Sequence, residues 1–475
     1  MINYDLIKSY FPSYPIGYIS DSYKKAHARM LPPNTGNTYS YIEARGGGES
    51  VTFFGLQYIL HRYFEGSKIT KEQVDLLEED CIKHFGSKTI FDRTPWDIIV
   101  NEYNGCFPLE IKAVKEGTNV GTSQVLITIE TTDHRLKGLD RYVEDLLMQI
   151  WYPISVATAS RNIHQVIYNG LVKSGTPESL PHRLVDFGKR GVSGMEEAGI
   201  GGLSHEVYSK ATDNWMSILF ARAFYSCDMP AFSVPASEHG VTSPWLKDNE
   251  KACYENLLKE FPTGYLSVVS DTWDVYNAVD NIFGKELKDK ILERDGVLVI
   301  RPDSGDPEVL LPWILQSLDH NFGSTVNEKG YKVLHDKVRV IQGDNVKIET
   351  IQLYCDAVMN AGFSLDNLVW GSGGGLLRNV NRDTFKFAQK ASATQQKGDW
   401  VGCKKDPVTD SGKKSKEGRL ALIENPTSKK LETIDIRGMR KDEVNLLETV
   451  FLNGQVLRHQ TLDEIREIAS SFWSN

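Results

Sequence analysis

Short apolar runs alternate with longer amphipathic stretches between about residues 183 and 380. The stretch 345–362 is typical of the amphipathic ones, because Ile348, Ile351, Cys355 and Val358 recur at helical spacing and share one face. Six short runs rich in β-forming residues lie in this region: 183–187, 231–234, 265–269, 297–300, 338–341 and 368–370. Strand–helix alternation of this kind predicts a parallel sheet with right-handed crossovers, either doubly wound or closed into a barrel.

Polar, charged or glycine-rich clusters follow each predicted strand at its carboxyl end. They occupy 186–188, 235–239, 270–271, 301–306, 342–344 and 371–375. In parallel α/β folds the loops that leave the strands converge at this edge, which is where ligands bind. Loops are polar in any protein, but six clusters that carry Asp, His, Arg and Gly favour a binding or catalytic site.

The two ends of the chain show a different pattern. Residues 1–150 mix helix and strand signals without regular alternation, and 385–475 contain a lysine-rich loop, a hairpin or short sheet, and a terminal helix at 462–470. We therefore predict an α/β fold in which 151–384 form a barrel-like domain. A second, mixed α+β domain is expected from 1–150 together with 385–475.

Composition excludes several classes of protein. The 475 residues include 54 Lys and Arg against 63 Asp and Glu, a formal charge of −9, which argues against non-specific binding to nucleic acid. No run approaches the ~18 consecutive apolar residues of a membrane span, and the N-terminus has no apolar signal region. The six cysteines include no C-x-x-C pair, as expected for free thiols in a reducing compartment. We expect a soluble, cytoplasmic protein without nucleic-acid or membrane partners.

The glycine run at 371–375 favours the binding of an anion. Glycines let successive backbone N–H groups turn toward a phosphate, and a following helix would add its positive dipole. The run matches neither a P-loop nor a dinucleotide-binding fingerprint, and a glycine run is also an ordinary tight turn.

Three other features carry candidate chemistry. The Arg301 side chain suits a phosphate, and Asp303 could accept hydrogen bonds from a ribose diol. A carboxylate of 301–306 could also hold Mg²⁺ through water. An ion pair between Arg and Asp with a purely structural role explains the same residues equally well. His239, after Glu238, is placed to act as a base, an acid or a phosphoryl acceptor, unless it is a structural histidine. The lysines of 404–416 form either a solvated loop or a basic flap over a polyphosphate.

Taken together, these motifs resemble those of the nicotinamide phosphoribosyltransferases, a family of type II phosphoribosyltransferases. The resemblance spans nearly the whole chain, through 21–24, 32–35, 186–193, 301–305, 342–344, 371–375 and 405–408. It implies an irregular, TIM-like parallel barrel. It also implies a reaction in which nicotinamide and 5-phosphoribosyl 1-pyrophosphate (PRPP) give nicotinamide mononucleotide and pyrophosphate, with Mg²⁺ and with ATP as co-substrate through a phosphohistidine.

The resemblance assigns roles residue by residue. His239 matches the phosphorylated histidine, with Glu238 beside it and Asp271 on its other ring nitrogen. A head-to-tail homodimer with shared sites is implied, in which Phe187 of one subunit and Tyr23 of the other sandwich the pyridine ring. The residues implied to bind phosphates and ribose are Arg190, Arg301, Asp303, Gly343, Asp344, Gly373 and Gly374, with Arg382, Lys386 and Lys405 of the neighbouring subunit. The alignment of Thr384 and Lys386 stays open, because their segment looks shorter than in animal members, and the metal ligands stay unassigned.

Asp213 is implied to choose between two substrates. Its carboxylate would accept a hydrogen bond from the amide of nicotinamide and repel the carboxylate of nicotinate. At an effective dielectric constant of ~20 and a distance of ~4 Å, this repulsion is about 4 kcal/mol. Two alternatives remain: a nicotinate phosphoribosyltransferase, which differs mainly at Asp213, and a non-catalytic nucleotide-binding protein.

Overall fold

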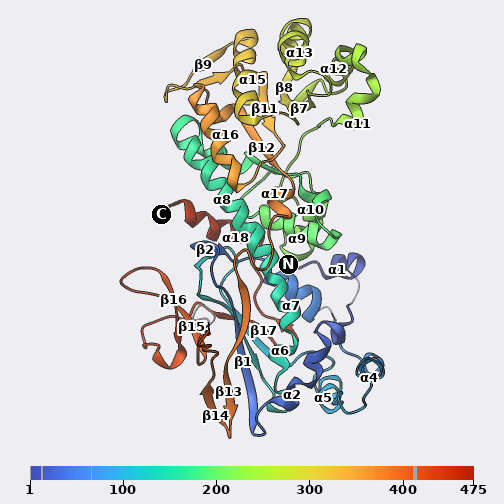
Figure 1. Ribbon diagram of the computed structural model, residues 1–475, viewed down its shortest axis with the longest axis vertical. Helices are drawn as coiled ribbons and strands as arrows, with labels where there is room; N and C mark the ends of the chain where they lie inside the picture. Colours follow the sequence, from blue (N-terminus) through green and yellow to red (C-terminus); the bar gives the residue numbers. More distant parts are fainter. Residues whose placement is uncertain (1, 12–13, 66, 410–413, 475) are drawn as a thin grey trace. The chain divides into compact units, whose positions relative to one another are not determined.

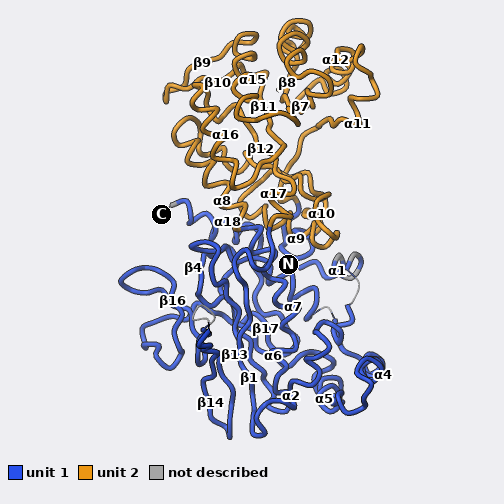
Figure 2. Tube along the Cα trace, in the orientation of Figure 1, with its two compact units in different colours: residues 1–157, 220–228, 380–475 blue, residues 158–219, 229–379 orange. Residues whose placement is uncertain are grey.

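The computed structural model describes residues 2–11, 14–65, 67–409 and 414–474, so Lys413 of the lysine-rich loop lies outside the described residues. The chain divides into two compact units (Figure 2). The first comprises 1–157, 220–228 and 380–475, and the second 158–219 and 229–379. No helix among the described residues has the length and apolar character needed to cross a lipid bilayer.

The second unit is built on a curled sheet of five parallel strands. Their spatial order is β6 (Leu184–Asp186), β12 (Leu368–Ser372), β11 (Val338–Gln342), β8 (Asp295–Arg301) and β7 (Thr263–Val269). All neighbouring pairs are parallel, as β-strand–helix alternation requires. Five of the six predicted strands are thus confirmed, together with the α/β class.

The prediction of a sixth strand at 231–234 is wrong. Only isolated parallel bridges form here, Ala211 with Phe232 and Ala236 with Ser267. Pro230 and Pro235 flank the segment and lack the N–H that a ladder needs. These bridges and that between Asp186 and Thr212 nevertheless continue the parallel pairings from β6 round to β7.

Helices follow the strands of the second unit (Figure 1). They are α8 (Trp151–Ser174, which begins in the first unit), α9 (Met195–His205), α10 (Trp215–Phe224, which ends in the first unit), α11 (His239–Thr242), α12 (Glu250–Glu260), α13 (Val275–Asn277), α14 (Lys288–Glu293), α15 (Pro307–Phe322), α16 (Ile348–Asn360) and α17 (Gly374–Leu377), with a small hairpin of β9 (Ser324–Val326) and β10 (Lys332–Leu334). On α16 the predicted apolar face is buried at Ile351, Cys355 and Val358. Ile348, at the first turn, is instead exposed, because the helix starts outside the packed core.

The first unit contains a seven-stranded antiparallel sheet with strands from both ends of the chain. The order is β14 (Asp399–Gly402), β13 (Phe387–Gln396), β1 (Thr35–Ala44), β5 (Val125–Thr131), β3 (Leu109–Ala113), β17 (Glu448–Leu452) and β18 (Gln455–Val456). Two pairs stand apart, β2 (Ser50–Thr52) with β4 (Asn119–Gly121) and β15 (Leu420–Glu424) with β16 (Leu431–Asp435). The β15–β16 pair confirms the predicted hairpin.

Short helices complete the first unit. They are α1 (Tyr4–Tyr10), α2 (His27–Met30), α3 (Leu56–Ile59), α4 (Lys71–Phe85), α5 (Thr94–Glu102), α6 (Leu139–Tyr142), α7 (Glu144–Leu147) and α18 (Leu462–Ser470). The predicted terminal helix is confirmed as α18, whose Thr461 and Glu464 form a capping box.

Residues 220–228 belong to the first unit because buried polar groups hold them there. The Gln57 side chain donates to the Phe224 carbonyl at 2.6 Å, and the Tyr225 hydroxyl donates to Glu116 at 3.0 Å. The Leu462 amide donates to the Tyr225 carbonyl. Since unpaired polar groups are costly in a core, these bonds hold the segment in this unit.

Candidate active site

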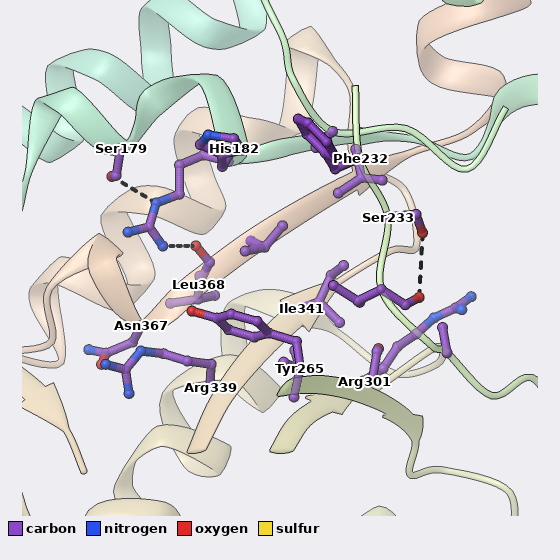
Figure 3. A pocket seen from close by; sticks show the side chains of 18 of the residues that line it. Ser179, His182, Phe232, Ser233, Tyr265, Arg301, Arg339, Ile341, Asn367 and Leu368 are labelled. Atoms are coloured by element: carbon purple, nitrogen blue, oxygen red, sulfur yellow. Dashed lines mark hydrogen bonds between the residues drawn. The ribbon is translucent and has the colours of Figure 1, made fainter. Parts of the chain in front are cut away.

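A cavity of about 680 Å³ lies inside the second unit, enclosed by the parallel strands and their loops. This volume falls in the range of roughly 300–1,000 Å³ that is typical of small-molecule sites. Its wall includes Phe187 and Asp213. Ser233 and Arg301 line the same wall (Figure 3). Tyr265 lies within the same view and points its hydroxyl toward the side where Arg339 and Asn367 lie.

Phe187 lies against two glycine positions. A Cβ on Gly371 would lie 2.0 Å from Phe187 Cε2, and one on Gly343 would lie 3.4 Å from the same atom. The Arg301 guanidinium carbon lies 5.4 Å from the centroid of the Phe187 ring, within cation–π range. Gly371 therefore makes room for the aromatic ring, whereas a Cβ on Gly343 would only touch it at ordinary contact distance.

Asp213 is held by hydrogen bonds at the cavity wall. The Ser233 hydroxyl donates to its Oδ1, and its backbone N–H donates to the Asp186 carbonyl at 3.1 Å. Burial raises the pKa of Asp213, against the opposing effects of Ser233 and Arg301. Sequence reasoning missed Ser233, because a serine within a predicted strand gives no signal of its own.

Asp186 fixes the turn that carries Phe187. Its side chain is fully buried and accepts hydrogen bonds from the Gly188 N–H at 2.6 Å and from Asn214 at 3.0 Å. Burial raises the pKa of Asp186 to about 6. The Phe187 amide in turn donates to the Ser372 carbonyl, so β6 and β12 end side by side at the site.

His239 begins α11 between two carboxylates. Its Nε2 lies 3.0 Å from Asp271 Oδ1, and its Nδ1 lies 3.8 Å from Asp303 Oδ2. Asp271 is almost fully buried and also accepts from the Ser304 hydroxyl and the Asp303 amide, whereas the imidazole is 44% exposed. The structure therefore brings three predicted catalytic residues together, with an accessible ring nitrogen. Their roles stay predictions.

The other predicted residues of this unit lie in or beside the loops that follow the strands, and their exposure differs. Glu238 Oε2 lies 3.8 Å from Arg190 Nη2, and both side chains are mostly exposed. Arg301 donates to Asp303 at 3.1 Å, and Asp344 is exposed. Gly373 and Gly374 pack close to 187–191. The helix predicted after the glycine run, α17, is only one turn long, so its dipole adds little.

Sequence comparisons place this geometry in a family. The model described as "Nicotinamide phosphoribosyltransferase, N-terminal domain" matches residues 15–111, and that of the "Nicotinate phosphoribosyltransferase (NAPRTase) family" matches 182–455. A nicotinamide phosphoribosyltransferase of Xanthomonas campestris is 39% identical over 95% of this chain and 97% of its own length. One of Acinetobacter baylyi is 31% identical over 94% of this chain and 95% of its own length. The chain belongs to the nicotinamide phosphoribosyltransferase family.

Solved structures support the same fold at low sequence identity. A nicotinate-nucleotide pyrophosphorylase of Pyrococcus furiosus superimposes with a TM-score of 0.60 at 14% identity, over 100% of this chain and 97% of its own. The human nicotinic acid phosphoribosyltransferase superimposes with a TM-score of 0.56 at 14% identity, over 96% of this chain and 93% of its own. These likenesses confirm a type II phosphoribosyltransferase fold.

Four residues that the resemblance assigns to the neighbouring subunit belong to the first unit. Tyr23 lies on a 3₁₀ turn, and Arg382 pairs with the adjacent Asp383 at 3.1 Å. Lys386 has a left-handed backbone (φ 54°), and the Lys405 amide donates to Ser415 at 2.8 Å. Their substrate contacts stay predictions.

Cationic side chains gather around Glu43 in the same unit. Arg45 lies 3.0 Å from Glu43, and Lys416 pairs with its other oxygen. Burial, followed by the charges of Arg45 and Lys405, lowers the pKa of Lys390. Lys390 and Arg45 were missed in the sequence because each stands alone in a strand or at its end. In this structure Arg45 and Lys416 neutralise Glu43, and the Lys390 amine lies close enough to interact with the same carboxylate.

The described residues contain no group of three or more His, Cys, Asp and Glu side chains arranged to hold a metal ion. Mg²⁺ keeps several waters and commonly binds through one or two carboxylates plus substrate phosphates. Asp303, with a 30% exposed side chain beside Arg301 and His239, fits that mode.

Proposed function

We propose that this protein transfers the 5-phosphoribosyl group of PRPP to the ring nitrogen of nicotinamide, which gives nicotinamide mononucleotide and pyrophosphate in the salvage of NAD. The observation that carries the proposal is Asp213, whose carboxylate lines the same cavity as Phe187 and Arg301. The relatives at 39% and 31% identity over nearly the whole chain are nicotinamide phosphoribosyltransferases, which supports the same reaction.

The chemistry asks for positioning and charge rather than for a base at the ring nitrogen. The C1–pyrophosphate bond breaks as the pyridine nitrogen attacks, through a transition state with oxocarbenium character. Phe187 offers a flat face for the pyridine, and Asp213 orients the carboxamide by accepting its N–H. Arg190 and Arg301 stabilise negative charge on the phosphates as the pyrophosphate leaves.

We further propose Mg²⁺ as the metal of this reaction. It would neutralise the leaving pyrophosphate, with Asp303 as the carboxylate that holds it through water. Asp271 is a weaker candidate, because its two oxygens already accept from His239, Ser304 and the Asp303 amide.

Coupling to ATP through His239 is proposed on its geometry. If Asp271 accepts the Nε2–H, the lone pair lies on Nδ1. Attack of Nδ1 on the γ-phosphorus of ATP would form the N–P bond and release ADP. The phosphoryl group adds about −2 charge, which changes the affinity of the site for substrates and products. Glu238 and Arg190 lie beside this position and would contact the nucleotide.

A head-to-tail homodimer with shared sites accounts for the residues of the first unit. Tyr23 would complete the ring sandwich in the partner's site, with Arg382, Lys386 and Lys405 on the pyrophosphate. Met195 and Trp215 are 62% and 74% exposed on the second unit, which supports an interface there. We also propose that the curled sheet forms part of an irregular closed barrel and that the first unit is a domain in its own right. We propose a cytoplasmic location as well, which the six free cysteines support.

Nicotinate remains the second candidate substrate, because the model matched over 182–455 is that of nicotinate phosphoribosyltransferases and Arg301 lies at the same wall. The test is incubation with PRPP, Mg²⁺ and either pyridine, followed by chromatography of the mononucleotide. We expect nicotinamide to be preferred by orders of magnitude in kcat/KM. A preference for nicotinate would overturn the assignment, and no product from either would favour a binding protein.

A further inference from the structure

Tyr23 is exposed on a turn whose following residues are partly or fully buried. Residues 21–26, here called the Tyr23 turn, contain the 3₁₀ helix Ser22–Ala26 and lead into α2. The Tyr23 side chain is 56% exposed, whereas Lys24 and Ala26 are buried. An exposed aromatic ring next to a buried anchor is well suited to stack on a flat ligand.

Lys24 anchors this turn through a buried ion pair. Its Nζ lies 2.6 Å from Asp145 Oδ1 and 3.1 Å from Glu144 Oε2, and its side chain is 4% exposed. Burial opposes the charge on Lys24, but Asp145 and Glu144 outweigh it and raise its pKa. Asp145 also accepts from the Asp21 amide at 2.6 Å. The first turn of α7 thus holds the Tyr23 turn at two points.

Lys25 anchors the turn in a second direction. Its Nζ lies over the rings of Trp96 and Tyr142, at 4.8 and 4.4 Å from their centroids. The same amine donates to the Gly17 carbonyl at 2.8 Å and contacts the Tyr142 hydroxyl. The two adjacent lysines therefore have different partners in the first unit: Lys24 pairs with carboxylates of α7, and Lys25 contacts two aromatic rings and a backbone carbonyl.

Two further contacts limit movement of the turn. The Ser22 hydroxyl lies 3.0 Å from His84 Nε2 on α4. The Tyr23 ring meets His27 edge-on, with centroids 5.0 Å apart and an interplanar angle of 68°. The backbone on both sides of Tyr23 is thus held, while Tyr23 itself stays 56% exposed.

We infer that Lys24 and Lys25 are positioning residues that hold Tyr23 ready to stack on the pyridine ring. The inference rests on the proposed function, in which Tyr23 completes the nicotinamide site of the partner subunit. Burying two lysine amines costs free energy, and ordering a loop on binding weakens affinity. A turn that is already ordered avoids the second cost when nicotinamide binds, which explains why two anchored lysines directly follow the exposed ring.

The test uses Lys24→Met and Lys25→Met in the full-length enzyme. We expect each to raise the KM for nicotinamide about tenfold, while kcat and the KM for PRPP change less than about twofold. Lys24→Arg should restore most of the loss. Lys251→Met is the matched control, since it removes a lysine that pairs with Glu286 at 2.8 Å on the surface of the second unit, and its KM should not change.

A double-mutant cycle with Tyr23→Ala separates positioning from general damage. In the Tyr23→Ala background, Lys24→Met should add little to the KM for nicotinamide, because the ring that it positions is gone. Full additivity, or unchanged KM values in both lysine variants, would overturn the inference. If Lys24→Met fails to fold, Lys25→Met and Asp145→Asn carry the same test. A Tyr23→Ala enzyme with an unchanged KM for nicotinamide would instead contradict the proposed role of Tyr23.

Discussion

The Phe187 ring occupies the space that a side chain at Gly371 would need, since a Cβ on Gly371 would lie 2.0 Å from Phe187 Cε2. Gly371 lies on β12 and Phe187 directly after β6, its neighbour in the sheet. The absence of a side chain at one strand therefore sets the position of the aromatic ring at the next. The glycine run contributes to this site by making room as well as by offering backbone N–H groups.

Gly371→Ala should displace the Phe187 ring from the cavity wall. A misplacement of about 1 Å can cost a hundredfold in rate, so we expect kcat/KM for nicotinamide to fall about a hundredfold. Gly438→Ala is the control, because its Cβ would meet nothing within 4 Å. Steady-state kinetics of both variants check this. Unchanged kinetics in Gly371→Ala would mean that Phe187 does not stack on the substrate.

Asp213→Asn should narrow the preference for nicotinamide over nicotinate. The variant removes the charge that repels nicotinate, worth about 4 kcal/mol at an effective dielectric constant of ~20, and keeps an acceptor for the amide. We expect the ratio of the two kcat/KM values to shrink at least about tenfold. An unchanged ratio would refute the role of Asp213 in specificity.

His239→Ala should abolish the stimulation of turnover by ATP and the incorporation of label from [γ-³²P]ATP. Asp271→Asn should keep the imidazole but slow phosphorylation by about a hundredfold, because the Nε2–H loses its carboxylate partner. His320, an exposed histidine on α15, is the control, and His320→Ala should behave as wild type. Persistent ATP stimulation in His239→Ala would remove the phosphohistidine.

Mixed dimers should reveal whether sites are shared. Tyr23→Ala and Arg301→Ala lie in different units, and each alone should have little activity when nicotinamide is held far below its KM. If a site takes Tyr23 from one subunit and Arg301 from the other, half of a mixed population has one intact site, so co-expression restores about a quarter of wild-type activity. A mixture no more active than its parents would contradict shared sites.

His164 should make the protein less stable as the pH falls. Its imidazole is fully buried on α8, its Nδ1 lies 2.8 Å from the Ser160 carbonyl, and burial lowers its pKa to about 4. In the unfolded chain the pKa is ordinary, near 6.5. Between pH 6.5 and 4 only the unfolded chain binds this proton, so the free energy of unfolding falls as pH falls, by about 2 kcal/mol at pH 5.

Thermal unfolding at pH 7.5 and pH 5 measures this effect. The melting temperature of His164→Gln should fall less between the two pH values than that of the wild type. Equal falls would show that another group, such as one of the buried carboxylates, carries the pH dependence.

Periodicity of the sequence determined the five strands of the second unit. Short apolar runs that alternate with amphipathic helices indicate parallel strands, whose carboxyl ends meet at one edge of the sheet. Five strands and the loops after them were therefore predictable: 184–186, 263–269, 295–301, 338–342 and 368–372. The positions of Phe187, Asp271 and Arg301 follow from that rule, since each lies at the end of a strand.

Contacts between residues far apart in the chain were decided by the tertiary structure alone. The pairing of β1 with β13, the grouping of 220–228 with the first unit, the Ser233–Asp213 bond and the anchoring of Lys24 by α7 leave no local pattern. Local patterns report only which face of an element is apolar, whereas the partners of a buried polar group depend on which distant segments pack against it. The loss of the predicted strand at 231–234 has the same origin, because two prolines remove the donors that pairing with its neighbours requires.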